Sequence, residues 1–358
     1  MESDINYFSD RLKDHEDDHQ GSSGAVTVDY LSHLRKKFIL LLVLTGAVLF
    51  VAVLAVARGA YPIPVGDVLR ALMGEGDLTT RVVILNIRLP RVIAAIVCGW
   101  GLSLSGLCIQ TLLRNPLGSP ITLGINHGAA FGATAAIVLF GASMVSTTMF
   151  AFGGGMIATI VILFLATFKR LSPAAIILTG VAMHSLFLSG IYLIQYIASE
   201  TELAQVVFWT FGDVARSGWR EIGLLTAVVV MMSLFLVRLQ WDLNAFSLGD
   251  EAAKGLGIRV NWIRLSGMAM ATIVAALATS YHGIIGFLGL IAPHTARRIV
   301  GEDHFLLIPF SAVLGALLLL AADTLGRLLI GSGSLPVGVV TSFLGAPLFL
   351  YLLVKEYR

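Results

Sequence analysis

Long apolar runs separated by short polar segments dominate the chain from residue 38 to its C-terminal end. A membrane-spanning helix needs about 20 predominantly apolar residues, and ten runs reach or approach that length. They cover residues 38–57, 92–112, 120–140, 146–168, 173–198, 221–237, 262–281, 284–299, 306–327 and 337–354. The pattern therefore predicts an all-α, polytopic membrane protein with ten transmembrane helices per subunit.

Three of these runs are less regular than the others. Residues 284–299 form a short run that contains Pro293, so a broken or tilted helix is expected there. The run 120–140 starts at a proline. The run 92–112 is able to start earlier, because Arg88-Leu89-Pro90-Arg91 can open a helix with the proline in its first turn.

The first 34 residues differ sharply from the rest of the chain, since they are polar and rich in carboxylates and include Gly-Ser-Ser-Gly at 21–24. Such a composition cannot bury a core, so we expect a disordered tail, and a single membrane domain over residues 35–358. The first apolar run follows Arg35, Lys36 and Lys37 rather than opening the chain. No cleavable signal peptide is therefore expected.

Composition supports the membrane class and excludes others. Of 358 residues, 57% are hydrophobic and 13% are charged, and the mean hydropathy is +0.87, well outside the range of soluble domains. A net charge of +2 gives no reason to expect nucleic acid as a partner. Cys98 and Cys108 fall in one run, about 15 Å apart along a helix, so they cannot form a disulfide with each other.

The distribution of positive charge predicts the orientation. If the N-terminus is inside, the inner segments hold 16 of the 24 Lys and Arg residues and the outer segments hold 8. This bias agrees with the positive-inside rule. Both termini and the loop 238–261 are therefore expected in the cytoplasm.

Within that loop, residues 247–260 form the longest polar interruption in the second half of the chain and resemble one short helix. Ser247 is expected as its N-cap with Asp250 three residues later, and Asp250 and Glu251 place negative charge at the positive end of the helix dipole. Gly255 and Gly257 are stop signals. A helix of about two turns is unstable alone, so we expect another surface to hold it.

Glu251-Ala252-Ala253, followed by Gly257, resembles the coupling loop of ABC importer permeases, which docks on a cytoplasmic ATPase. Four further stretches resemble the permeases of iron-siderophore, haem and vitamin B12 importers, the FecCD or BtuC type. They are RLPRVIAAIVCGWGLSLSGLCIQ (88–110), LLRNPLGSPITLGINHGA (112–129), HGIIGFLGLIAPHTARRIVG (282–301) and LPVGVVTSFLGAPLFLYLL (335–353). The resemblance thus runs from residue 88 to the C-terminus.

This resemblance implies a BtuC-like type II ABC importer permease, with ten helices in each subunit of a homodimer in a bacterial or archaeal inner membrane. It implies two ATPase subunits below and a periplasmic or lipid-anchored substrate-binding protein above. The chain has no phosphate-binding Gly-x-x-x-x-Gly-Lys-Ser/Thr motif, so it is not expected to be an enzyme. ATP and Mg²⁺ would be used by the partner, and the chain itself is expected to bind no cofactor or metal.

The expected cargo is an iron-siderophore or a similar metal chelate, and cobalamin, haem and molybdate are alternatives within the same family. A secondary transporter driven by ions would need ionisable residues near the middle of the membrane. Asp323 and Arg327 are the only charged side chains well inside the runs, and they lie near an outer end at a spacing that lets them pair. The ABC class is therefore favoured.

The resemblance also implies roles for individual residues. The ATPase-coupling residues are Leu248, Gly249, Asp250, Glu251, Ala252, Ala253, Gly255, Leu256 and Gly257. Binding-protein docking is assigned to Arg58 and Arg327, although headgroup contact for the first and pairing with Asp323 for the second would also explain them. The translocation path is assigned Asn115, Pro116, Asn126, His127 and His184, with packing as the alternative for the histidines.

Two positions depart from the family pattern. Ser334 stands where an acidic residue is common, and Asn126-His127 stands where a pair of small polar residues is common. These departures do not change the family, but they leave the identity of the chelate open. The sequence also leaves open whether the dimer is homomeric and what the acidic tail does.

Overall fold

The computed structural model describes residues 31–58, 63–141, 143–329 and 335–356. The predicted tail, residues 1–34, lies mostly outside these ranges. Contacts divide the chain into two units, Met1–Gly46 and Ala47–Arg358. The predicted end of the tail at residue 34 is too late, because residues 31–34 already belong to the first helix.

Among the described residues, seven helical stretches are long and apolar enough to cross a membrane. They are Leu31–Ala57, Leu78–Leu113, α6 (Met144–Thr167), α7 (Pro173–Ile197), α9 (Trp219–Arg238), α12 (Val260–His282) and α14 (His304–Leu329). Three other helices, α5 (Ile125–Leu139), α13 (Leu288–Val300) and α15 (Val337–Glu356), match the remaining apolar runs. Each of the ten predicted runs thus corresponds to one helix, and the all-α fold is confirmed.

The stretch Leu78–Leu113 is composite. It consists of α3 (Leu78–Val82), a π-helical segment η1 (Val83–Arg88) and α4 (Leu89–Leu113). Pro90 lies in the first turn of α4 directly after the π-helical segment, and because proline has no N–H it cannot donate a backbone hydrogen bond to that segment. The early start expected for the second run is therefore confirmed, and the helical stretch extends further back than the 88–91 motif alone indicates.

Two helices begin later than the runs predict, each for a local reason. Residues 116–124 form turns, and Gly124 ends them with φ +74° before α5 begins at Ile125. Before α13, the chain passes through Gly283 at φ +77° and Phe287 at φ +62°, so the helix begins only at Leu288. An apolar run identifies the segment but not these left-handed turns, since they depend on a single backbone conformation.

Short helices form the connections. α2 (Val65–Leu72) precedes α3, α8 (Glu200–Thr210) and the 3₁₀ turn η2 (Val214–Arg216) connect α7 to α9, and α10 (Gln240–Phe246) and α11 (Asp250–Gly255) connect α9 to α12. A capping box opens α8, because Ser199 and Glu202 satisfy each other's backbone N–H groups.

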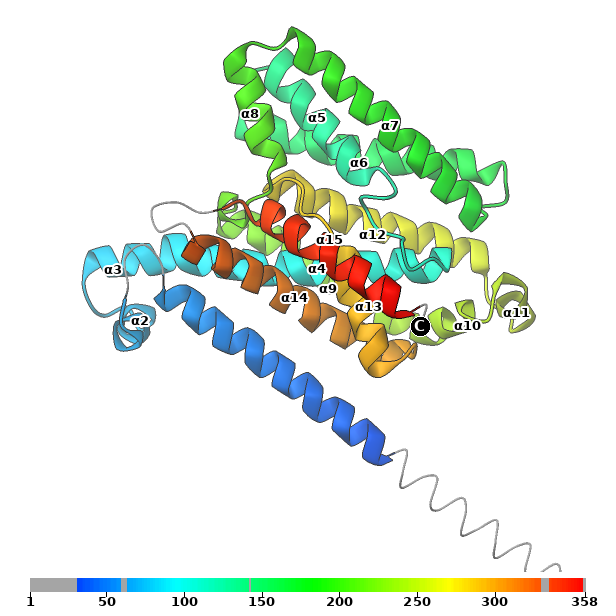
Figure 1. The fold of residues 1–358 in the computed structure, drawn as a ribbon, viewed down its shortest axis with the longest axis horizontal. Coiled ribbons are helices and arrows are strands. Elements are labelled where there is room, and N and C mark those ends of the chain that lie inside the picture. Colours follow the sequence, from blue (N-terminus) through cyan, green and yellow to red (C-terminus); the bar gives the residue numbers. More distant parts are fainter. Residues whose placement is uncertain (1–30, 59–62, 142, 330–334, 357–358) are drawn as a thin grey trace, which may run out of the picture. The chain divides into compact units, whose positions relative to one another are not determined.

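Most of α4 is buried, and α9, α12, α13 and α14 pack around it, whereas α5, α6 and α7 pack with one another. α12 contacts both groups and lies between them in Figure 1. Small residues allow the close approach: a Cβ on Gly106 would collide with the Gly289 backbone, and one on Gly99 with that of Gly315. Ser103 and Ser105 donate hydrogen bonds of 2.7 Å to carbonyl groups on α14 and α12.

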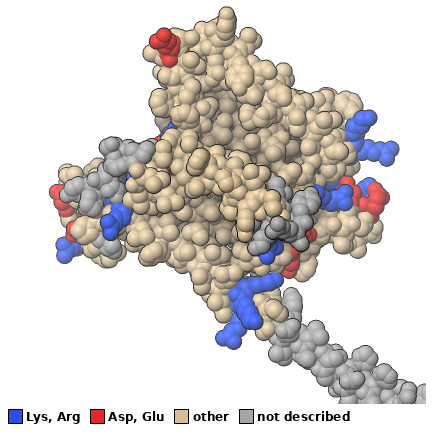
Figure 2. Space-filling model, in the orientation of Figure 1, with Lys and Arg blue, Asp and Glu red and all other residues tan. Residues whose placement is uncertain are grey.

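Charged residues lie at the margins of this helical unit. In the face shown in Figure 2, Lys, Arg, Asp and Glu lie near α2 and α3, near α10 and α11, at the turn between α6 and α7 and near α8, with a wide uncharged area between them. Large apolar side chains are also exposed on the membrane-length helices, such as Leu193 on α7 and Leu234 on α9, which are 70% and 65% exposed. Such a surface is suited to lipid rather than to water.

Candidate functional site

The predicted coupling helix is present as α11, but it is shorter than expected. It begins at Asp250 after Gly249, which has φ +107°, and ends at Gly255. The predicted capping by Ser247 is wrong, because the Ser247 hydroxyl donates to the Asn244 carbonyl at 2.6 Å and closes α10 instead. One turn and a half of helix cannot be stable alone, so its position depends on its contacts.

The strongest of these contacts is an ion pair with a buried arginine. Arg264 is 1% exposed, and its two terminal nitrogens donate to the Asp250 carboxylate at 2.8 and 3.1 Å. The same guanidinium donates to the carbonyl groups of Leu112 and Leu171 at 3.2 Å each, and it lies 5.5 Å from the centre of the Phe246 ring. One side chain thus joins α11 to the ends of α4 and α10 and to the turn between α6 and α7.

The electrostatics keep this contact charged. Burial alone would raise the pKa of Asp250, but hydrogen bonds and charge from Arg264, with further help from Arg114 and Lys254, hold it below its usual value. Arg114 lies 3.9 Å from the same carboxylate. Asp250 is therefore ionised at neutral pH, and α11 is held by a charge-assisted, two-pronged hydrogen bond.

The other residues assigned to coupling divide into one buried and several exposed positions. Ala253 is fully buried and fixes the inner side of the helix. Leu248 and Leu256 are 69% and 65% exposed at its two ends. Glu251, Ala252, Gly255 and Gly257 are also exposed. An exposed face of small residues between two leucines is suited to docking, and the coupling role of these residues stays a prediction.

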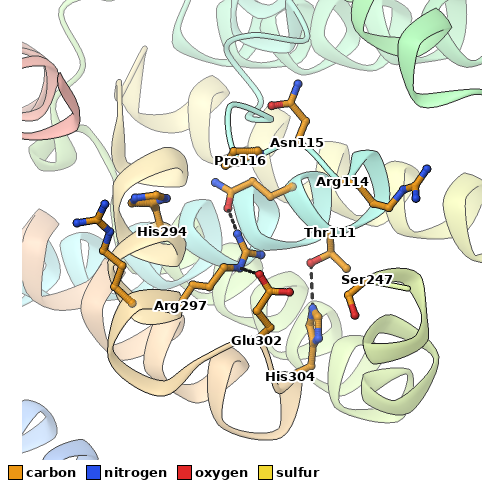
Figure 3. A pocket seen from close by; sticks show the side chains of 11 residues that line it. Thr111, Arg114, Asn115, Pro116, Ser247, His294, Arg297, Glu302 and His304 are labelled. Carbon is orange, nitrogen blue, oxygen red and sulfur yellow. Dashed lines mark hydrogen bonds and ion pairs between the residues drawn. The ribbon is translucent and has the colours of Figure 1, made fainter. Parts of the chain in front are cut away.

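Beside α11, a polar cavity of about 470 Å³ opens at the same end of the helices (Figure 3). Its lining residues come from the ends of α4, α10, α13 and α14 and are Gln110, Thr111, Arg114, Asn115, Pro116, Ser247, His294, Arg297, Arg298, Glu302 and His304. The structure therefore brings the predicted path residues Asn115 and Pro116 to a cavity.

Hydrogen bonds organise the walls of this cavity. The Thr111 hydroxyl lies 2.9 Å from Nε2 of His304, whose Nδ1 lies 2.6 Å from the Asn244 side-chain oxygen. Arg297 donates to the Gln110 side-chain oxygen at 3.3 Å and lies 3.9 Å from the Glu302 carboxylate. Figure 3 shows the contacts of α4 with Arg297 on α13 and with His304 at the start of α14, so the cavity is braced on two sides.

The turn that begins at Arg114 links the cavity to α11. Arg114 has a left-handed backbone with φ +46° and caps α4, while its guanidinium points away from Arg297 and approaches Asp250. The Asn115 side-chain oxygen accepts a hydrogen bond of 2.9 Å from the Leu117 N–H, which is an Asx turn. The Asx turn explains the shape of this segment. The contact between Arg114 and Asp250 connects the segment to α11.

The three remaining path residues lie elsewhere. The rings of His127 and His184 are 3.8 Å apart, so α5 and α7 meet at these side chains. Asn126 is buried, and none of the three lines the polar cavity. Across the described residues, no group of three or more His, Cys, Asp or Glu could hold a metal ion. The path assignment of these residues therefore stays a prediction.

The docking arginines differ from each other. Arg58 is exposed, whereas the Arg327 side chain is 11% exposed, lies 3.2 Å from the Asp323 carboxylate and donates to the Ala55 carbonyl at 3.0 Å. The predicted Asp323–Arg327 pairing is thus confirmed. Asp323 is fully buried, and its carboxylate also accepts a hydrogen bond of 2.8 Å from the Arg91 guanidinium. Docking stays a prediction, and for Arg327 it would compete with these internal contacts.

Sequence reasoning missed Arg91 and Arg264, both of which were counted only as charges at helix ends. A signal was available for Arg264, because it lies two residues inside the apolar run 262–281. A charged residue inside such a run needs a partner. The acidic residue of the neighbouring loop, Asp250, is that partner.

Comparison with known proteins gives consistent results. Residues 41–355 match the FecCD transport family. A protein of Methanocaldococcus jannaschii assigned as an ABC transporter permease is 45% identical, over 92% of this chain and 98% of its own length. The Fe(3+)-citrate import system permease YfmE of Bacillus subtilis is 35% identical, over 90% of this chain and 97% of its own length.

A solved structure assigned to the metal-chelate type of ABC transporter, in an inward-facing conformation, superposes with a TM-score of 0.80. It is 33% identical and covers 88% of this chain and 99% of its own chain. Sequence and fold therefore agree over nearly the whole membrane part.

Proposed function

Because the chain belongs to the FecCD transport family and is the permease of an ABC importer for metal chelates, haem, vitamin B12 or related cargo, we propose that it transports an iron-siderophore or similar metal chelate. Transport would run from a substrate-binding protein outside to the cytoplasm of a bacterial or archaeal cell. Both termini and α11 would face the cytoplasm, and two copies of the chain would enclose the path.

The observation that carries the mechanism is the contact between Asp250 and Arg264. An ATPase that grips the exposed side of α11 would move a helix too short to bend or slide independently. Arg264 would pass that movement to the end of α4 and to the α6–α7 turn, since it bonds the carbonyl groups of Leu112 and Leu171. ATP and Mg²⁺ act in the partner, and this chain supplies the moving joint.

The polar cavity is the proposed cytoplasmic end of the path. Arg114 contacts Asp250 and also starts the turn that carries Asn115 and Pro116 into the cavity wall. Movement of α11 would therefore reshape the exit at the same time as the helix ends. The ATPase can drive this change in the exit only if it contacts the two states of the permease differently. The proposed joint would allow such a difference, because α11 would be in a different position in each state.

The chemistry of the cavity favours an anionic cargo. Arg114, Arg297 and Arg298 line it, against the single carboxylate of Glu302. A cationic wall attracts carboxylates and oxyanions through Coulomb forces. Haem, cobalamin and molybdate remain alternatives within the family, and native mass spectrometry of the cognate binding protein would identify the cargo.

Exposed residues of α11 provide the test of the coupling role. Glu251→Arg and Ala252→Trp should abolish ATP-driven uptake in proteoliposomes, because both change the docking face without touching the core. Ala253 is unsuitable, since it is buried and a larger side chain would disturb packing. Glu200→Arg on α8 is a matched control that reverses an exposed charge elsewhere. Normal uptake by both α11 variants would refute the assignment.

A further inference from the structure

A second cavity, of about 430 Å³, lies on the other side of the coupling loop. Arg238 contributes from the end of α9, Asp242 from α10, Leu256 and Ile258 from the segment after α11, and Arg259 and Trp262 from the start of α12. None of these residues lines the polar cavity of Figure 3. The second cavity is therefore a separate feature with its own chemistry.

The second cavity has two arginines in its lining that are free to bind an anion. Arg238 and Arg259 are both exposed, and neither lies within ion-pair distance of a carboxylate among the described residues. Arg259 rests 5.9 Å from the centre of the Trp262 ring, which holds its guanidinium at the rim. Asp242 is the single acidic residue of the lining. Two guanidinium groups against one carboxylate favour an anion.

The surroundings of the cavity are those of a membrane boundary. α9 ends at Arg238 and α12 begins at Val260, and both helices have the length and composition of membrane spans. Just inside this boundary, Leu234 is 65% exposed and Leu265 is 45% exposed. Trp262 is 52% exposed at the same level, and tryptophan is enriched where hydrocarbon meets headgroups.

These observations together describe a ligand with two parts. An anionic group would enter the cavity between the two arginines, and an apolar chain would continue along the exposed leucines of α9 and α12. We propose that this cavity binds the phosphate headgroup of an anionic phospholipid, with Arg238 and Arg259 as its ligands. Basic residues at the membrane surface attract such lipids, and the apolar strip distinguishes a lipid from free phosphate.

The site would affect coupling through its position. Leu256 and Ile258 follow α11 directly and form one wall of the cavity, so a bound lipid would hold the C-terminal side of the coupling helix. This consequence rests on the proposed function, whereas the binding does not. Lipid binding measured on the isolated protein therefore tests the site even if the transport assignment fails.

The test is a lipid titration of the full-length protein in detergent, followed by native mass spectrometry. Phosphatidylglycerol is compared with phosphatidylcholine of the same chains and with inorganic phosphate. We expect the Arg238→Gln/Arg259→Gln double variant to bind phosphatidylglycerol on the order of 30-fold more weakly than wild type, with phosphatidylcholine binding unchanged. Lys169→Gln/Arg170→Gln, which removes two cations from the α6–α7 turn, should bind like wild type.

Three outcomes would overturn the proposal. Equal phosphatidylglycerol binding by wild type and the double variant would exclude the two arginines as ligands. Displacement of the lipid by inorganic phosphate at a similar concentration would assign the cavity to a free anion. Loss of the bound lipid when the cognate ATPase assembles on the protein would assign the cavity to the ATPase interface.

Discussion

Two carboxylates, one at each end of the helices, are held by arginines in nearly the same way, but their settings differ. Asp323 is completely buried and is paired with Arg91 at 2.8 Å and Arg327 at 3.2 Å. Asp250 is 25% exposed and is paired with Arg264 at 2.8 Å, with Arg114 at 3.9 Å. Two arginines hold the central acid of each cluster, and in the first cluster Arg91 also lies 3.6 Å from a second acid, Asp213.

The elements that carry the clusters explain the difference. Asp323, Arg91 and Arg327 lie on the long helices α4 and α14, which pack closely along their length. Asp250 lies on a helix of six residues between two turns. The same chemistry therefore joins two long packed helices at one end, here called the clamp, and ties a short connecting helix to the helical unit at the other, which is the joint proposed above.

The largest expected effect is at the clamp. Asp323→Asn removes the buried carboxylate that Arg91 and Arg327 share and leaves Arg91 with the more distant Asp213 at 3.6 Å, so it should lower the free energy of unfolding by about 3–5 kcal/mol. Thermal unfolding of the purified protein in detergent would measure the loss. Asp67→Asn, which removes the acid of an exposed pair with Arg70 at 3.5 Å, is the control and should change little. Equal unfolding temperatures for the two variants would contradict the clamp.

Asp250→Asn should reduce coupled uptake strongly and stability only slightly. Arg264 would keep the carbonyl groups of Leu112 and Leu171 as partners, so the stability loss should be only about 1–2 kcal/mol. Uptake per ATP hydrolysed in proteoliposomes should fall roughly tenfold, which corresponds to a loss of about 1.4 kcal/mol of coupling. A variant that unfolds like Asp323→Asn, or one that couples normally, would remove the distinction between joint and clamp.

The sequence predicted the clamp only in part, and the reason is physical. Asp323 and Arg327 are four residues apart on one helix, so their pairing follows from helical geometry. Arg91 lies 232 positions before Asp323, and only the packing of α4 against α14 brings the two together. Pairing within a helix can be read from spacing, whereas pairing between helices needs the fold.

The joint, too, could be predicted from the sequence only in part. The polar loop, its charged helix start and its glycine stops indicated α11 at the correct place, although Ser247 caps nothing there. The place of Arg264 inside an apolar run indicated an acidic partner, but its contacts with Leu112 and Leu171 could not be predicted, because both acceptors are backbone carbonyl groups. Carbonyl acceptors leave no signature in a sequence, so contacts made to them are found only in the structure.

A smaller effect is expected on the exposed side of the joint. Lys254 pairs with Glu251 at 2.7 Å, but the two side chains are 53% and 88% exposed. Such pairs contribute roughly 0.2–1 kcal/mol at most, so Lys254→Ala should leave the unfolding temperature unchanged within error. Circular dichroism melting of wild type and variant side by side would measure this. A drop comparable to that of Asp250→Asn would mean that the exposed pair, rather than Arg264, holds α11.

The smallest effect is expected from pH, and it follows from the sign of the Asp250 shift. Arg264 and its neighbours hold the folded pKa of Asp250 below the unfolded value, so the stabilisation is complete above the unfolded pKa and is lost only as pH falls through the lowered one. Uptake per ATP hydrolysed should therefore stay flat from about pH 8 to about pH 5 as far as Asp250 is concerned. Asp250→Asn should be equally flat at its lower level, since it carries no titrating group. A fall in wild-type coupling between pH 7 and 5 that Asp250→Asn abolishes would show that Asp250 protonates in the working range, and hence that Arg264 does not hold it in the state that transports.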